Sequence, residues 1–151
     1  MMDARNKKIL EILQINGRIT NKEIAEKILL SPPSVLERVK KMESEKIIIG
    51  YKAILNRKAI GRPILAFTFI MLSNNSAETI KSVLNYLSQI PELLEVYHLT
   101  GRFDFLVKTT ATSLENLNEI ISEKISKAPG IQKVETSLVL DANEKNIYPI
   151  D

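Results

Sequence analysis

The stretch LSPPSVLERVKKME, Leu30–Glu43, decides how the first third of this 151-residue chain is interpreted. Ser31 is an N-cap candidate, and proline is tolerated in the first turn of a helix because the N–H group that it lacks has no intrahelical partner there. Pro33 disfavours helical angles at Pro32, so the first regular turn is expected at Pro33, or at Ser34 with SVLE as a capping box. The pattern predicts a helix with two prolines at its start.

At about 100° per residue, the side chains of this helix separate into an apolar face and a polar, basic face. The apolar face is predicted to hold Val35, Leu36, Val39 and Met42, and the opposite face to hold Pro33, Ser34, Glu37, Lys40, Lys41 and Ser44, with Arg38 on its flank. Taken alone, a basic amphipathic helix is more often a solvated surface than a nucleic-acid contact. The segments ahead of it therefore decide the interpretation.

Two shorter helices are predicted ahead of this one. The first follows Asp3, a possible N-cap, carries apolar residues over 9–13 and ends near Asn16-Gly17. The second opens at TNKE, Thr20–Glu23, which has the form of a capping box, and ends near Leu29-Leu30. Three short helices with a basic last one match the helix-turn-helix arrangement, in which the second helix of the motif enters the major groove of DNA.

The helix-turn-helix assignment predicts contacts to double-stranded DNA. The two prolines would leave a small surface with few donors that can approach base edges, and the helix N-terminus favours a phosphate. The candidate DNA-binding residues are Arg18, Thr20, Lys22, Ser31, Pro33, Ser34, Glu37, Arg38, Lys40 and Lys41.

The distribution of charge supports this assignment. Residues 1–62 hold 14 Lys and Arg against 7 Asp and Glu, a balance of +7, whereas residues 63–151 hold 7 against 11, a balance of −4. Together they give the net charge of +3 for the whole chain. A basic first part joined to an acidic second part indicates that nucleic-acid binding is confined to the first.

The stretch IIIGYKAILN, Ile47–Asn56, changes to β-branched and alternating character and predicts a strand with Lys52 pointing outward. It is either a wing of the DNA-binding domain or a connector, and we favour a connector strand that also pairs with a second subunit. The predicted organisation is a helix-turn-helix domain over 1–50, a connector over 51–62 and a second domain over 63–151.

The second domain is predicted to contain two β-α-β units in tandem. In the first, the apolar strand ILAFTFIML, Ile64–Leu72, is followed by a helix that stops before Pro91 and by the strand LLEVYHL. In the second, the strand FDFLVKTT is followed by a helix, by Pro129-Gly130 and by the strand IQKVETSLVL. The units align at an offset of 38 residues, which places Phe67 over Phe105. This is the β-α-β-β-α-β order of the ferredoxin-like fold, with two helices on one face of a four-stranded antiparallel sheet.

The predicted fold class is therefore α+β, and the sheet carries a further expectation about partners. The strand Ile64–Leu72 is apolar on both parities, although one face of such a sheet would meet water in a single chain. We infer that two chains pack sheet against sheet as a homodimer. Two-fold symmetric dimers read palindromic half-sites, which suits a helix-turn-helix domain.

Composition argues against several other classes of protein. The chain has no Cys, and the single His98 cannot build an imidazole cluster, so neither a metal site nor a cofactor is expected. No apolar run approaches the ~20 residues of a bilayer span, and the first residues lack the features of a secretory leader, so a cytoplasmic location is expected. A catalytic set of His98 with Tyr97, Asp104 and Glu135 can be imagined, but no phosphate loop, acid pair or nucleophile motif supports an enzyme.

Five stretches carry a family likeness: NGRIT, NKEIAEKILLSPPSVLERVKKME, the GY at Gly50-Tyr51, HLTGRFDFLVKT and APGIQKVETSLVL. Together they resemble the Lrp/AsnC family of feast/famine transcriptional regulators over nearly the whole chain. The most specific pieces are LSPPSVLERVKKME and the G-x-x-D formed by Gly101 and Asp104. Lys46 departs from the family pattern, in which many members have Gly before the strand.

The resemblance implies a helix-turn-helix domain and a ferredoxin-like effector domain that dimerises through its sheet. It also implies dimers that assemble into octamers or related rings, and often an amino acid bound near the G-x-x-D loop. Gly101 would let backbone N–H groups approach a carboxylate, and Asp104 could pair with an α-ammonium group. Arg102 would either hold the ligand carboxylate or pair with Asp104, and a hairpin glycine with a turn aspartate is an equally weighted alternative. The candidate effector residues are Tyr97, Gly101, Arg102, Asp104, Thr136 and Ser137.

Two functions compete on these observations. One is a sequence-specific transcriptional regulator that responds to a small amino acid. The other is a sequence-tolerant architectural protein that bends or wraps DNA without an effector. Phosphate-dominated association, which the second function implies, loses affinity steeply with salt and shows a small ratio of specific to nonspecific binding.

Overall fold

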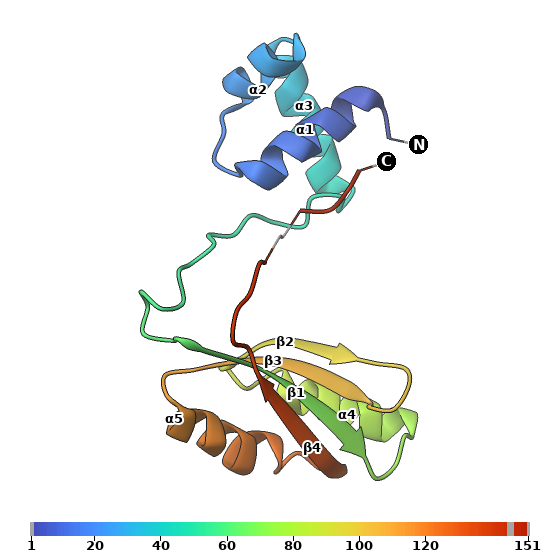
Figure 1. Ribbon diagram of the computed structural model, residues 1–151. Coiled ribbons are helices and arrows are strands. Elements are labelled where there is room, and N and C mark those ends of the chain that lie inside the picture. The colour runs from blue at the N-terminus through green and yellow to red at the C-terminus, as the bar shows by residue number, and fades with distance from the viewer. Residues whose placement is uncertain (1, 145–146, 151) are drawn as a thin grey trace. The chain divides into compact units, whose positions relative to one another are not determined.

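The computed structural model describes residues 2–144 and 147–150 and divides into two units (Figure 1). The first, which we call the head, comprises the chain up to Ile54 together with the described residues after Ala142. The second, which we call the sheet domain, spans Leu55–Ala142. The described residues contain no helix long and apolar enough to cross a membrane.

The head contains three helices, α1 (Ala4–Ile15), α2 (Asn21–Ile28) and α3 (Pro32–Ser44), and each is capped at its N-terminus by the residue predicted for that position. The cap residues are Asp3, Thr20 and Ser31, whose side-chain oxygens accept from the backbone N–H three residues on. Thr20 and Glu23 form the complete capping box. The helices enclose a core of buried side chains that comprises Ile9, Ile24, Ala25, Val35, Val39 and Met42.

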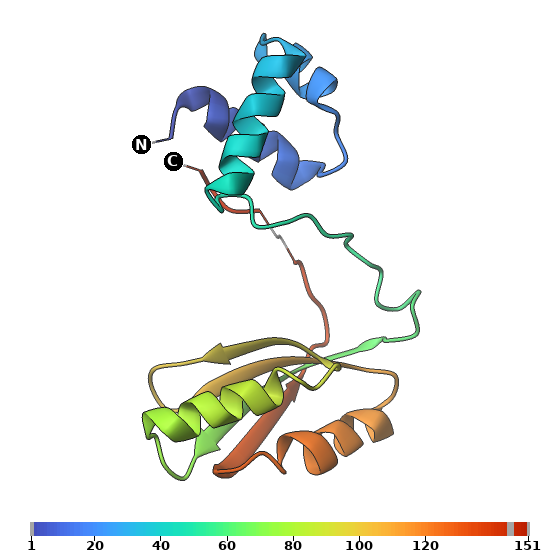
Figure 2. The same ribbon diagram turned by 180° about the vertical axis from the view of Figure 1, so that it is seen from behind.

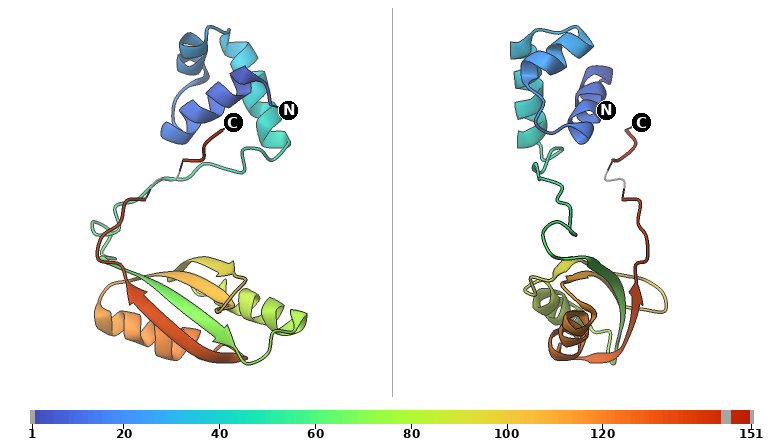
Figure 3. Two further views of the ribbon diagram at one scale, coloured as in Figure 1. Left: turned by 45° about the vertical axis from the view of Figure 1, so that its right-hand side comes forward. Right: turned by 60° about the vertical axis from the view of Figure 1, so that its left-hand side comes forward.

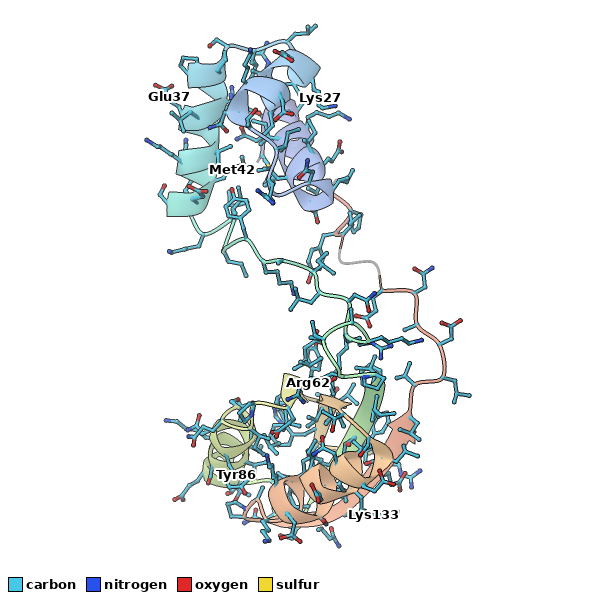
Figure 4. The ribbon with its side chains drawn as sticks, turned by 90° about the vertical axis from the view of Figure 1, so that its left-hand side faces the viewer. Lys27, Glu37, Met42, Arg62, Tyr86 and Lys133 are labelled. Atoms are coloured by element: carbon cyan, nitrogen blue, oxygen red, sulfur yellow. The ribbon has the colours of Figure 1, made fainter. Side chains whose placement is uncertain are left out.

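Helix α3 differs from the prediction in two details. It begins at Pro32 rather than at Pro33 or Ser34. The first turn of a helix needs no N–H from a proline, and the Ser31 cap stabilises this start; together these effects outweigh the tendency of Pro33 to push Pro32 out of helical angles. Leu36, expected on the inner face, is 40% exposed. Met42 points into the head, whereas Glu37 lies on the outer side of α3 (Figure 4).

In the single chain, residues 47–56 have no regular secondary structure, so the strand predicted over Ile47–Asn56 as a connector that pairs with a second subunit stays a prediction. A strand exists only by pairing with a neighbour, and no segment of the described chain pairs with this one. The segment leaves α3 through Lys46, which has a φ of 58°. This left-handed conformation explains why many members of the resembled family have Gly here.

The sheet domain has the predicted ferredoxin-like order. Its elements are β1 (Ile64–Leu72), α4 (Ala77–Leu87), β2 (Leu93–His98), β3 (Phe105–Ala111), α5 (Leu114–Glu119), the π-helical turn η1 (Ile120–Ile125) and β4 (Ile131–Leu138). The strands are antiparallel in the order β2-β3-β1-β4, and α4 and α5 cover one face of the sheet (Figure 2).

Alternation along β1 assigns its two faces. Ala66, Ile70 and Leu72 belong to the core under the helices, and Thr68 on the same parity is fully buried. The residues of the other parity therefore point to the face that carries no helix; they are Leu65, Phe67, Phe69 and Met71. The right-hand view in Figure 3 shows the sheet close to its edge, with the helices on one side only. We call the face without helices the open face.

Candidate nucleic-acid interface and effector loop

The outer face of α3 is polar and basic, as predicted. Lys40, Lys41 and Glu37 are exposed, and Pro33 and Ser31 lie exposed at the N-terminal end of the helix. The amine of Lys41 lies 3.8 Å from the carboxylate of Glu45, one turn further along the helix. An exposed pair of this kind is weak, so Lys41 remains able to exchange its partner for a phosphate.

Arg38 takes part in a contact that the helical periodicity did not indicate. Its Nη1 donates to Asp3 Oδ2 at 2.5 Å and to Asn6 Oδ1 at 2.7 Å, which ties α3 to the start of α1. The guanidinium lowers the pKa of the Asp3 carboxyl, helped by the N–H of Asn6. Arg38 is thus held within the head, and a DNA phosphate would have to compete with Asp3 for it.

The remaining candidates occupy the first turns of α2 and α3. Arg18, Thr20 and Lys22 are exposed around the start of α2, and Ser34 is half-buried in the first turn of α3. The Thr20 hydroxyl is used in the capping box, where it lowers the pKa of the Glu23 carboxyl. Thr20 can therefore contribute to DNA binding mainly by fixing the start of α2.

A polar hollow of about 350 Å³ opens beside the outer face of α3. It is lined by Asp3, Asn6, Ser34, Glu37, Arg38 and Lys41. Charged groups of both signs meet in it, so it can offer either a cation to a phosphate or a carboxylate to a base amino group.

The loop between β2 and β3, residues 99–104, is the predicted effector site, and its backbone is tied to β1. Asp104 N donates to Ile70 O, and Leu99 N donates to Asp104 O, both at 2.8 Å. Gly101 has a φ of 118°, a conformation that side chains rarely adopt, and a Cβ built there would meet no atom within 4 Å. The glycine is therefore required by the backbone conformation and leaves open space beside the loop.

The carboxylate of Asp104 has a structural partner that the sequence did not reveal. Its Oδ2 accepts from the N–H of Leu72 at 2.6 Å, beyond Ile70, the last residue of β1 that pairs with β3. A strand residue past the end of the neighbouring strand has no ladder partner for its N–H on that side, and Asp104 supplies one. A carboxylate has a second oxygen, so this bond does not exhaust its capacity to accept.

Arg102 contacts Glu135 and Phe103 rather than Asp104. Its Nη2 lies 3.6 Å from Glu135 Oε1 on β4, and its guanidinium lies 5.1 Å from the ring centroid of Phe103. The Phe103 ring in turn lies 5.2 Å from that of Phe69 on β1. Lys133, and to a smaller extent Arg102, lowers the pKa of Glu135.

The other candidates divide between the two faces of the sheet. Thr136 bonds the buried Thr68 hydroxyl at 3.0 Å, on the helix side, whereas Ser137 has the opposite parity and belongs to the open face. Tyr97, 47% exposed, donates its hydroxyl to Glu95 at 2.7 Å. Thr136 or Ser137 was expected near the ligand, and because consecutive strand residues point to opposite faces, one strand can offer only one of them to a given face.

Sequence reasoning placed the loop but missed the side chains that pack around it. Phe69 and Phe103 were not predicted as residues around the loop, because a strand that is apolar on both parities does not show which of its sides is covered. Glu135 was considered only as part of a catalytic set. Among the described residues, no group of three or more His, Cys, Asp or Glu is placed to hold a metal ion.

Comparisons with known proteins cover both units of the chain. Residues 2–43 match the AsnC-type helix-turn-helix domain, and residues 65–146 match the Lrp/AsnC ligand binding domain. A leucine-responsive regulatory protein of Rhizobium meliloti (strain 1021) is 34% identical over 92% of this chain and 89% of its own length. Transcriptional regulator AzlB of Bacillus subtilis (strain 168) is also 34% identical, over 100% of this chain and 97% of its own.

Solved structures show the same architecture. The transcriptional regulator NMB0573 of Neisseria meningitidis, solved as a complex with L-Met, superposes with a TM-score of 0.93 at 27% identity, over 99% of this chain and 97% of that one. AsnC of E. coli superposes with a TM-score of 0.84 at 30% identity, over 100% of this chain and 98% of that one.

Proposed function

The chain belongs to the Lrp/AsnC family of DNA-binding transcriptional regulators, and from this premise we propose how its head reads DNA and how its loop 99–104 binds an effector. The single observation that carries the DNA-binding half is α3, a capped second helix of the motif whose exposed face presents Lys40 and Lys41. In this arrangement the first turns of α3, from Ser31, approach base edges in the major groove, and the lysines contact phosphates.

Two roles are open to Arg38, a direct DNA contact or a positioning contact within the head. If DNA displaces Asp3 and Asn6 from it, Arg38 becomes a direct contact; if not, it positions α1 against α3. Gel-shift titrations of the Lys41→Ala and Arg38→Ala variants on a selected operator, with Lys81→Ala in α4 as the control, separate the roles. Loss of a phosphate contact reduces the slope of log affinity against log salt by about 0.9, whereas loss of a positioning contact leaves that slope unchanged. An unchanged affinity and slope for Lys41→Ala would remove Lys41 from the interface.

We propose a small amino acid as the effector, because a structural relative was solved with L-Met. The ligand carboxylate meets the backbone N–H groups of Gly101 and Arg102, and its ammonium meets Asp104 Oδ1, the carboxylate oxygen that does not bond Leu72. Ser137 lies on the open face level with Phe67, and it joins this site if a neighbouring chain supplies it; Thr136 bonds Thr68 on the helix side.

Thermal shift against the twenty amino acids tests this proposal. A ligand at ~100 times its dissociation constant stabilises the protein by ~2.7 kcal/mol. Asp104→Asn removes the charge and keeps an oxygen for Leu72 N, so it should abolish binding without unfolding the protein, while Asp141→Asn should bind as the unchanged chain does. Equal binding by all three proteins would contradict the role of Asp104. Failure of every amino acid at millimolar concentration would favour the architectural alternative, to which the regulator relatives lend no support.

We further propose that a homodimer forms through the open face. The apolar centre of this face is contributed by Phe67, Phe69 and Met71 of β1 and by Leu106 of β3. The connector offers a second surface, because Ile49 is 90% exposed and Ile54 is 78% exposed. Pairing of this segment with a second subunit would bury both and give it the strand partner that the single chain lacks.

A further inference from the structure

The C-terminal segment Ile147–Ile150 lies on the head and is held by one side chain. Gln14, in the last turn of α1, donates from Nε2 to Tyr148 O at 3.1 Å and accepts at Oε1 from Tyr148 N at 2.7 Å. A primary amide has one donor side and one acceptor side, so Gln14 bonds the segment as a neighbouring strand would.

The backbone of the segment suits this pairing. Pro149 restricts the preceding Tyr148 to extended angles. In an extended residue the N–H and C=O groups point to the same side, so a single side-chain amide can reach both. The segment is therefore ordered partly before it binds, which lowers the entropy cost of holding it.

A mostly apolar hollow of about 370 Å³ lies between the segment and the head, and the segment forms part of its wall. It is lined by Leu10, Leu13 and Gln14 of α1, by residues 47–51, and by Tyr148 and Ile150. The wall formed by 47–51 is fixed to the head, because Tyr51 donates its hydroxyl to Glu43 at 3.0 Å and its ring lies against Gly17. Burial, together with Glu43, raises the pKa of Tyr51.

We propose that the segment Ile147–Ile150 is a releasable second attachment of the head to the sheet domain. The head already continues into β1 through the connector, and this segment continues from β4, whose ladder extends to Val139 N bonding Leu65 O at 2.9 Å. A domain held by one flexible linker reorients freely, whereas a second attachment removes part of that freedom.

The contact is weak enough to open. It consists of two hydrogen bonds and of side chains that stay largely in water, since Tyr148 is 81% exposed and Ile147 is 53% exposed. Such a contact persists because the segment is tethered at an effective concentration in the millimolar range. The segment follows β4, the strand that carries Ser137. If an effector shifts β4, release of the segment would let the head reorient more freely. This consequence rests on the proposed function, whereas the attachment itself does not.

Hydrogen exchange on the full chain tests the attachment without DNA or effector, so its outcome is independent of the proposed function. In the unchanged protein, the Tyr148 amide should exchange more slowly than an unstructured amide. Gln14→Ala removes both hydrogen bonds and should accelerate it by at least about fivefold to tenfold, the equivalent of one of them, and should also accelerate amides in 47–51. The matched control is Gln89→Ala, an exposed glutamine beyond α4, which should change neither.

A second variant guards against a head that fails to fold without Gln14. Tyr148→Pro removes the N–H that Gln14 accepts from and lies outside the helices, so it should accelerate exchange in 47–51 while α1 and α3 stay protected. Exchange of the Tyr148 amide at the unstructured rate in the unchanged protein would overturn the proposal. The proposal would also be overturned if the amides of residues 47–51 exchanged in both variants at the same rates as in the Gln89→Ala control.

Discussion

Replacing Asp104 by Ala should destabilise the sheet domain even in the absence of any ligand. The carboxylate accepts from Leu72 N at 2.6 Å, and Leu72 is only 5% exposed, so the variant leaves a buried N–H without its partner. A hydrogen bond to a charged group is worth about 1.5–3 kcal/mol, and we expect a loss of about 2 kcal/mol in the free energy of unfolding. For a domain of this size, that loss lowers the Tm by about 8–16 °C.

Chemical and thermal unfolding, followed by circular dichroism, measure this loss. Asp104→Asn should recover about half of it, because the amide oxygen still accepts but without a charge. Asp141→Ala, an exposed aspartate beyond β4, serves as the control and should leave the sheet domain unchanged. A Tm for Asp104→Ala within a degree or two of the parent would refute the structural role, and combined with lost amino acid binding it would make Asp104 purely a ligand residue.

Three further changes probe other parts of the molecule. Phe69→Asp should convert the proposed dimer into monomers in light scattering, because it places a charge in the open face, whereas Thr68→Asp should unfold the chain because Thr68 is fully buried. Lys124 lowers the pKa of the Glu92 carboxyl from its usual 4.5. This ion pair therefore stabilises the fold above pH 4.5, and the stabilisation is lost as the pH falls through the lowered pKa. Glu92→Gln should accordingly be less stable than the parent at neutral pH and should approach the stability of the parent in acid. Lys46→Val should cost about 1–2 kcal/mol, since a β-branched residue is strained at a φ of 58°, and Lys46→Gly should cost nothing.

Each of these tests has an outcome that contradicts it. A dimeric Phe69→Asp protein would remove the open face as the interface. Glu92→Gln is compared with Glu119→Gln, an exposed position on α5, and equal acid behaviour of the two would show that the Lys124 pair is unimportant. For Lys46, a glycine variant less stable than the valine variant would show that backbone strain is not what limits this position.

The sequence by itself determined the parts that depend on neighbouring residues. The caps Asp3, Thr20 and Ser31 act on amides three residues away, so the pattern that predicts them contains both partners. The ferredoxin-like order followed in the same way from two β-α-β units with their turn residues. The G-x-x-D turn ahead of β3 was also visible in the sequence, because its glycine and aspartate are neighbours along the chain, although the strand predicted from Phe103 begins only at Phe105.

Only the tertiary structure decided which distant groups meet. Arg38 was assigned to DNA by its helical position, but Asp3 and Asn6 lie within reach of it once α1 packs across α3. Asp104 likewise has Leu72 N as a partner because β1 and β3 pair with one particular register. A polar side chain bonds whichever complementary group packing brings within about 3 Å, and that choice depends on segments far away in the sequence.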